Sequence, residues 1–165
     1  MLEDNAIGHF EEPCPYPELE WTAEVADALF IPVSQGEQEV DLAQFRRMIR
    51  MKAADMVQPD VCYVGGISRC LKVARMAQAA GLPCTPHSAN LSMVALFTLH
   101  LQTALSNASH FMEFGIEDSP WVQGLFASDP FKVVDGHVEV PAGPGWGVEI
   151  NQSWLANANR QISSR

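Results

Sequence analysis

The sequence predicts an α/β fold in which buried parallel strands alternate with helices, amounting to slightly more than half of a (β/α)8 barrel. Two observations lead to this prediction. Four segments carry the apolar period of amphipathic helices, and each follows a short apolar run that lacks the alternation of a sheet with one solvated face. The runs end about 23–27 residues apart, which is the length of one βα unit.

Each element has its own local signals. The expected strands are the runs "IGHFEE", "IPVSQGE", "DMVQPD", "PCTPH" and "HFMEF", which end at Glu11, Glu37, Asp60, His87 and Glu113. The helices between them are expected over residues 19–29, 42–49, 67–80 and 91–105. Asp41 is a candidate N-cap of the second helix, Gly65-Gly66 opens the third, and Gly81-Leu82-Pro83 ends it.

The pattern changes after Glu113. The segment "FKVVDGHVEVP" has two β-rich arms around Asp135-Gly136, a strong signal for a type I′ hairpin, and "PAGPGWGVEI" is typical of an extended Gly/Pro-rich stretch. We therefore expect a partial barrel domain over residues 1–113 and an extended, hairpin-containing tail over residues 114–165 that packs back on it. A small surface hairpin without such packing fits the sequence equally well.

Composition excludes several classes of function. The chain has 165 residues, 47% of them apolar, a formal charge of −10 and only ten Lys and Arg, so a nucleic-acid partner is not expected, whereas an acidic chain can hold a metal cation. No apolar run is long enough for a membrane span, and no leader sequence is visible, which predicts a cytoplasmic protein without a membrane partner. The four cysteines lack CxxC pairing and are expected to be buried, reduced thiols.

Carboxylates at two neighbouring strand ends indicate a metal site. In barrels of this type the reactive residues stand at the C-terminal ends of the strands. Glu11 and Glu37 end neighbouring strands, and Mg²⁺ prefers a few carboxylates completed by water and substrate. Strand alternation lets only one of Glu11 and Glu12 face the barrel mouth. A solvated turn is the alternative interpretation of the Glu11-Glu12 pair.

The next strand ends indicate acid/base chemistry. Asp60 and His87 end neighbouring strands, and an aspartate beside an imidazole fixes its tautomer and raises its basicity. Glu113, on the fifth strand, could hydrogen-bond a developing oxyanion if it is protonated. A structural core histidine and a surface glutamate are the alternatives. The remaining histidines, His9, His100, His110 and His137, are expected to be structural.

The size of the rate enhancement that enzymes need limits the reaction classes that fit these residues. A positioned acid or base contributes about 10²- to 10⁴-fold, whereas enzymes commonly reach about 10⁶-fold or more. A base alone is therefore insufficient for a weak carbon acid, and a divalent metal on a substrate carboxylate would supply the missing electrostatic stabilisation of an enediolate. The constellation suggests abstraction of a proton next to a carboxylate.

At these residues the sequence resembles the mandelate racemase subgroup of the enolase superfamily. The matching words are "FEEP", "GE" after an apolar strand, "VQPDVCYVGGIS", "PHSAN" and "MEF", in order over about residues 1–155. The resemblance implies the C-terminal half of a (β/α)7β barrel in which Glu11 and Glu37 are two of three Mg²⁺ ligands. It also implies that His87 and Asp60 form the acid/base dyad and that Glu113 hydrogen-bonds the substrate carboxylate or its enolate.

The sequence also departs from this subgroup. It has no counterpart of the family's N-terminal capping domain, of the second-strand base or of the third-strand aspartate that would be the remaining metal ligand. The expectation is therefore the C-terminal half of a Mg²⁺-dependent acid-sugar dehydratase that acts on a small sugar-acid carboxylate and is homo-oligomeric at full length. The alternatives are a racemase or epimerase of a 2-hydroxy acid, a catalytically silent truncated half-barrel, and an unrelated metal-dependent aldolase.

Overall fold

A short parallel sheet forms the N-terminal part of the computed structural model, which describes residues 2–117 and 119–163. Its strands are β1 (Phe10–Glu11), β2 (Val33–Gln35) and β3 (Met56–Val57), in the spatial order β1-β2-β3. Parallel bridges continue this order from Val57 to Cys84 and from Cys84 to Ala108. The first four expected strands and Ala108, which precedes the fifth, are thus side by side in sequence order, as in a (β/α) barrel.

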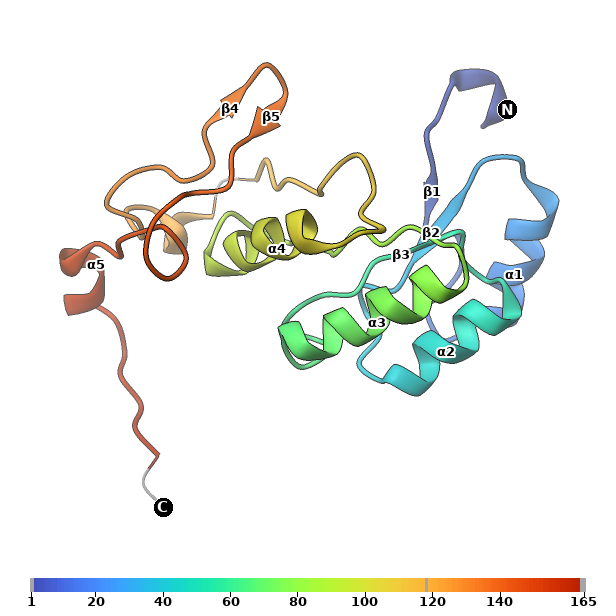
Figure 1. The fold of residues 1–165 in the computed structure, drawn as a ribbon, viewed down its shortest axis with the longest axis horizontal. Helices are drawn as coiled ribbons and strands as arrows, with labels where there is room; N and C mark the ends of the chain where they lie inside the picture. Colours follow the sequence, from blue (N-terminus) through green and yellow to red (C-terminus); the bar gives the residue numbers. More distant parts are fainter. Residues whose placement is uncertain (1, 118, 164–165) are drawn as a thin grey trace.

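Helices alternate with the strands as expected. They are α1 (Leu19–Ala28), α2 (Leu42–Met51), α3 (Ile67–Ala79) and α4 (Met93–Ala104), and α1 to α3 lie together beside the sheet (Figure 1). The Asp41 side chain accepts a hydrogen bond of 2.9 Å from the Ala43 N–H, which confirms it as the N-cap of α2. Gly66, with φ 105°, precedes α3 and gives the backbone the conformation that the turn into this helix needs.

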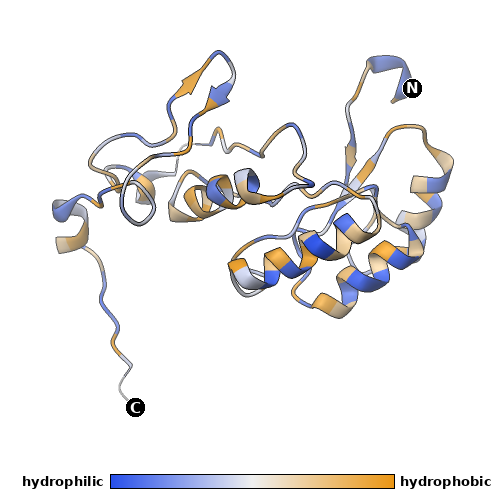
Figure 2. Cartoon of the chain, in the orientation of Figure 1, coloured by the Kyte–Doolittle hydropathy of each residue, from blue (hydrophilic) through white to orange (hydrophobic). Residues whose placement is uncertain are grey.

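The main core lies between the sheet and these helices. Its buried members are Leu19, Phe45, Met48, Ala53, Ala54, Val57, Val61, Val64, Cys70, Val73, Ala74, Ala77, Cys84 and Leu101. Helices α1 to α3 show hydrophobic and hydrophilic residues on different sides (Figure 2), which is the pattern of helices that cover one face of a sheet.

The segment after α4 forms a second apolar cluster on this helix. Ala95, Leu96 and Phe131 are its buried members, and Phe114, Phe126, Trp146 and Val148 are among the residues packed against them. The predicted hairpin is present as β4 (Val133–Val134) paired with β5 (His137–Val138). Asp135 and Gly136 have φ of 50° and 76°, as a type I′ turn requires. The elements η1 (Glu3–Asn5), η2 (Pro120–Val122) and α5 (Gln152–Ala156) were not predicted.

Two local expectations are wrong. The strands are shorter than the apolar runs: β2 ends at Gln35, two residues before Glu37, and the last bridge involves Ala108, five residues before Glu113. The cysteines are all free, but only Cys70 and Cys84 are buried, whereas Cys62 is exposed. Cys62 lies in the turn that follows Asp60, and it is exposed there although Val61 and Val64 of the same turn are buried in the main core.

Candidate active site

Three segments that follow strands bring the proposed acid/base residues together. Asp60 and His87 form a parallel bridge between their backbones, so their side chains leave neighbouring chain segments at the same level. The Asp60 Oδ1 atom accepts hydrogen bonds from the Cys62 N–H at 2.7 Å and the Tyr63 N–H at 2.8 Å, which fixes the carboxylate on its own loop. The other oxygen is then free to face the imidazole.

His87 is paired with Asp60 through one ring nitrogen. Nδ1 lies 2.8 Å from Asp60 Oδ2, and both residues are buried, with 7% and 3% of their surface exposed. A carboxylate can only accept, so Nδ1–H donates and the neutral imidazole carries its lone pair on Nε2. Nε2 is therefore the nitrogen that can take a proton from a substrate.

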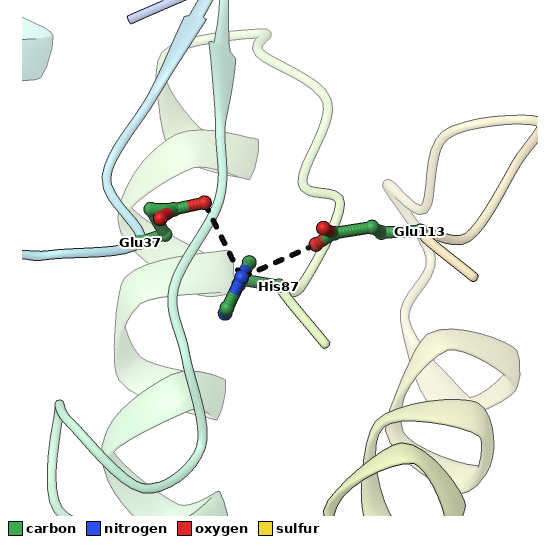
Figure 3. A group of neighbouring side chains, drawn as sticks. All are labelled: Glu37, His87 and Glu113. Atoms are coloured by element: carbon green, nitrogen blue, oxygen red, sulfur yellow. Dashed lines mark ion pairs between the residues drawn. The ribbon is translucent and has the colours of Figure 1, made fainter. Parts of the chain in front are cut away.

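Two further carboxylates surround that second nitrogen. His87 Nε2 lies 3.3 Å from Glu37 Oε2 and 3.5 Å from Glu113 Oε2 (Figure 3). Glu113 is itself held by a hydrogen bond of 3.0 Å from the Ser88 N–H to the same Oε2 atom. Glu37, His87 and Glu113 thus converge from three separate segments, with ligand atoms within 4.8 Å of one another.

The pKa values within the dyad follow from opposing effects. Burial lowers the pKa of His87, but its hydrogen bond to Asp60 and the charges of Glu113 and Glu37 outweigh burial, and the pKa lies above its usual value. Burial raises the pKa of Asp60, but the hydrogen bonds from His87, Tyr63 and Cys62 outweigh it, and the pKa lies below its usual value. The Asp60 carboxylate is therefore charged at neutral pH and stabilises the imidazolium that forms when His87 takes a proton.

Several carboxylates lie close together around Glu37, where a metal ion is predicted to bind. Burial raises the pKa of Glu37, His87 lowers it, and the like charges of Glu12, Glu11 and Glu113 raise it further, so the net shift is upward. Burial likewise raises the pKa of Glu12 despite its hydrogen bond from Gln38. Such crowded carboxylates repel one another, and a divalent cation would remove this repulsion.

The Glu11-Glu12 pair does not follow simple strand alternation. Glu11 is exposed, and its Oε1 accepts a hydrogen bond of 2.9 Å from Gln58 Nε2. Glu12 has φ 40°, outside the β region, so the alternation expected after Glu11 ends there. Its Oε2 accepts from Gln38 Nε2 at 2.9 Å, and its Oε1 is buried without a hydrogen-bond partner among the described residues.

The donor set fits Mg²⁺. Glu11, Glu12 and Glu37 offer carboxylate oxygens, the ligands that hard cations prefer, and the buried Glu12 Oε1 has no hydrogen-bond partner among the described residues, which leaves it able to accept from a cation. The two predicted ligands, Glu11 and Glu37, do not lie in one close group. The close group consists of Glu37, His87 and Glu113, and Glu11 lies outside it.

Sequence reasoning missed two glutamines in this site. Gln58 and Gln38 each donate a side-chain hydrogen bond to one carboxylate of the Glu11-Glu12 pair. A signal for Gln58 was available, because it stands two residues before Asp60 in an extended run, and residues two apart share one face of a strand.

A cavity of about 420 Å³ lies elsewhere, between α4, the segment 109–114 and the hairpin, and is not lined by His87.

Three of the other four histidines make contacts outside this cluster. His9 stacks on Phe111 with ring centroids 5.2 Å apart, and the His100 ring lies 5.2 Å from that of Trp146. His137 Nδ1 bonds the backbone oxygen of Asp135 in the hairpin turn. Among the described residues, His87 is the one histidine in a cluster of three potential metal-binding or acid/base side chains.

An α/β barrel arrangement with carboxylates and a histidine-aspartate dyad after its strands defines a class of barrel enzymes. The chain belongs to the enolase C-terminal domain-like family, whose model matches residues 1–154. This confirms the fold expected from the motifs, the C-terminal half of a (β/α)7β barrel.

Curated and solved relatives agree with this assignment. Arabinonate dehydratase of Saccharolobus solfataricus is 32% identical over 149 residues, covering 90% of this chain. A crystal structure from Roseobacter denitrificans, provisionally named a racemase, has a TM-score of 0.93 and 54% identity over 96% of this chain. A mandelate racemase/muconate lactonizing protein from Paracoccus denitrificans, solved with magnesium, has a TM-score of 0.86 and 30% identity over 98% of this chain.

The chain spans only part of each relative. It covers 39% of the dehydratase, 44% of the Roseobacter denitrificans chain and 43% of the Paracoccus denitrificans chain. Within residues 2–117 and 119–163, no helix is both long and apolar enough to cross a membrane.

Proposed function

We propose that this chain provides the general base and two metal ligands of a Mg²⁺-dependent acid-sugar dehydratase. The observation that carries the proposal is the position of His87, whose Nδ1 is held by Asp60 while Nε2 faces Glu37 and Glu113. A buried imidazole with one nitrogen fixed and the other facing two carboxylates is arranged for proton transfer. The arabinonate dehydratase relative supports a sugar acid as the substrate class.

In this proposal the chain's own residues perform the proton chemistry. His87 Nε2 removes the proton α to the substrate carboxylate, and Asp60 stabilises the resulting imidazolium. Glu113, held by the Ser88 N–H and in its protonated form, donates a hydrogen bond to the substrate carboxylate as it becomes an enediolate. When bound by Glu11 and Glu37, Mg²⁺ supplies positive charge for the same developing oxyanion.

Loss of the β-hydroxyl completes a dehydration. The electron pair of the enediolate forms the new double bond as the C–O bond at the β-carbon breaks, and His87 returns its proton to the leaving hydroxide. Water leaves, and the enol product tautomerises to a 2-oxo acid. Without a leaving group, reprotonation of the α-carbon gives racemisation or epimerisation instead, and the provisional racemase name of the Roseobacter denitrificans relative keeps that reaction as the runner-up.

A second candidate is that the chain is catalytically silent when it is alone. Among the described strands, β1 pairs only with β2, and the bridge at Ala108 joins only Cys84. Both lateral edges therefore present unpaired backbone groups, which favour association with another chain or segment.

Deuterium exchange tests the proposed function. The chain is incubated with Mg²⁺ in D₂O with a panel of aldonic and aldaric acids, and deuterium at C2 and 2-oxo acid formation are followed by NMR. We expect the rate to fall about 10²- to 10⁴-fold in His87→Asn. The matched control is His137→Asn, which changes an exposed histidine of the hairpin and should retain the rate.

The outcomes separate the candidates. Full exchange in His87→Asn would contradict the role of His87 as the base. A chain that binds Mg²⁺ but neither exchanges deuterium into any acid of the panel nor forms a 2-oxo acid would favour the catalytically silent candidate over the dehydratase.

A further inference from the structure

The side chain of Gln58 is buried beside the proposed metal site. Gln58 follows β3 directly, its backbone N–H donates to the Gln35 oxygen at 3.0 Å, and only 3% of its surface is exposed. Burying a primary amide is unfavourable unless its polar atoms are hydrogen-bonded. The partners of this amide therefore indicate why the residue is there.

Its NH₂ group donates to the Glu11 carboxylate. Gln58 Nε2 lies 2.9 Å from Glu11 Oε1. Glu11 ends β1 and Gln58 follows β3, and β2 lies between these two strands, so the bond reaches across the position of β2. It connects an exposed glutamate to a side chain that is held in the interior.

The other polar atom of the amide has no such partner. Gln58 Oε1 is buried without a hydrogen bond among the described residues, which lowers the stability of the fold. An amide turned by 180° would place this oxygen against the Glu11 carboxylate, where two acceptors repel, so the observed orientation follows from the contact with Glu11. A buried polar group that lowers stability in this way is explained better by positioning Glu11 than by packing.

From these contacts we infer that Gln58 is a positioning residue that holds Glu11 in the rotamer in which its second oxygen, Oε2, is available to a divalent cation. The inference rests on the metal site of the proposed function. Gln58 is suited to this role because an amide donor fixes the carboxylate without adding a positive charge that would compete with the cation. Hydrogen bonds to metal-binding side chains commonly contribute about 10- to 100-fold in metal affinity.

Substitution by methionine tests the inference, because methionine keeps the shape and approximate volume and removes both polar atoms. Mg²⁺ binding to the metal-free chain is measured by isothermal titration calorimetry for the unaltered chain and for Gln58→Met. We expect the dissociation constant to rise about 10- to 100-fold in the variant. Urea unfolding in EDTA should show a metal-free stability that is equal or higher, because an unsatisfied buried oxygen has been removed.

Gln102→Met is the matched control. Gln102 on α4 is likewise buried with an Oε1 that lacks a hydrogen-bond partner among the described residues, and its Nε2 donates to the backbone oxygens of Ser109 and Phe111 at 3.1 Å, so this variant changes a buried glutamine without touching the carboxylates of the site. Its dissociation constant should stay within about threefold of the unaltered chain, below the range expected for a ligand-orienting bond.

Each result has a separate meaning. If Gln58→Met binds Mg²⁺ as the unaltered chain does, or if it loses affinity and metal-free stability together, the positioning role is wrong while the metal site stands. If the unaltered chain shows no saturable Mg²⁺ binding, both the metal site of the proposed function and this inference fail.

Discussion

At the scale of single residues, the behaviour of His87 depends on how Asp60 is held. Asp60 uses one oxygen for two N–H groups of its own loop and the other for the imidazole. Its orientation is therefore set by the loop that follows β3 and not by His87. A substitution at Asp60 that keeps the shape of the side chain can therefore change the tautomer of His87.

Asp60→Asn should reverse the tautomer of His87. The oxygen of the introduced amide can still accept from the loop, but its NH₂ group would donate to Nδ1, which places the imidazole hydrogen on Nε2 and removes the lone pair that accepts the substrate proton. We expect deuterium exchange to fall about 10²- to 10⁴-fold. Asp55→Asn is the control, because Asp55 Oδ2 accepts from the Val33 N–H at 2.9 Å and takes no part in the dyad.

The same variant predicts a change in the pH dependence of stability. The pKa of Asp60 is lower in the folded state than its ordinary value of 3.8, so its contribution to the free energy of unfolding is present above pH 3.8 and is lost as the pH falls through the folded value. The stability difference between the unaltered chain and Asp60→Asn should therefore shrink on acidification below pH 3.8. Urea unfolding from about pH 7 down to about pH 3 measures it, and a difference independent of pH would contradict the prediction.

The cysteines allow a second prediction at this scale. Burial raises the pKa of Cys70 and of Cys84 to about 12 from the ordinary 9.0, so near neutral pH each has about 10³-fold less thiolate than a free cysteine. A thiol reagent such as Ellman's reagent should label exposed Cys62 first and reach Cys70 and Cys84 only after denaturation. Cys62→Ser should remove the first labelling phase, and rapid native labelling of all sites would show that the core opens readily.

At the scale of elements, helices were predictable and the site was predictable only in part. The apolar period placed α1 to α4 within about two residues because each helix covers one face of the sheet. Spacing placed Asp60, His87 and Glu113 at one site, because parallel strands end at the same edge. The conformation of Glu12 was not predictable, since a φ of 40° is uncommon for glutamate, and neither was the bond from Gln58 to Glu11, which joins residues 47 positions apart.

The turn after β2 supports a prediction at this scale. Gly36 has φ +132°, and a Cβ there would lie 2.8 Å from a Phe45 ring carbon and 3.3 Å from the Gln58 nitrogen. Gly36→Ala should therefore lower the free energy of unfolding by about 1–3 kcal/mol and also weaken Mg²⁺ binding, because Glu37 follows it directly. Gly8→Ala is the control, since a Cβ at Gly8 meets nothing within 4 Å. Equal urea midpoints for the two variants would contradict the steric argument.

At the scale of the whole chain, two apolar clusters divide the packing. The main core joins the sheet to α1, α2 and α3, and the second cluster joins the segment after residue 113 to one side of α4. Helix α4 contributes to both, with Leu101 in the first and Leu96 in the second. The tail thus depends on α4 for its position, and the site depends on both clusters, because Asp60 precedes Val61 of the main core whereas Glu113 lies between Met112 and Phe114 of the second cluster.

Phe131→Ala should separate these two parts. Phe131 is 6% exposed and makes edge-to-face contacts with Phe126 at 5.8 Å and Phe114 at 6.3 Å between ring centroids, so its truncation should destabilise the second cluster by about 3–5 kcal/mol. Hydrogen exchange followed by mass spectrometry should show lost protection over residues 119–151 and unchanged protection over α2 and α3. Val134→Ala, at an exposed position of the hairpin, is the control and should leave both regions unchanged. Loss of protection in α2 and α3 as well would show that the tail and the barrel segment unfold as one cooperative unit.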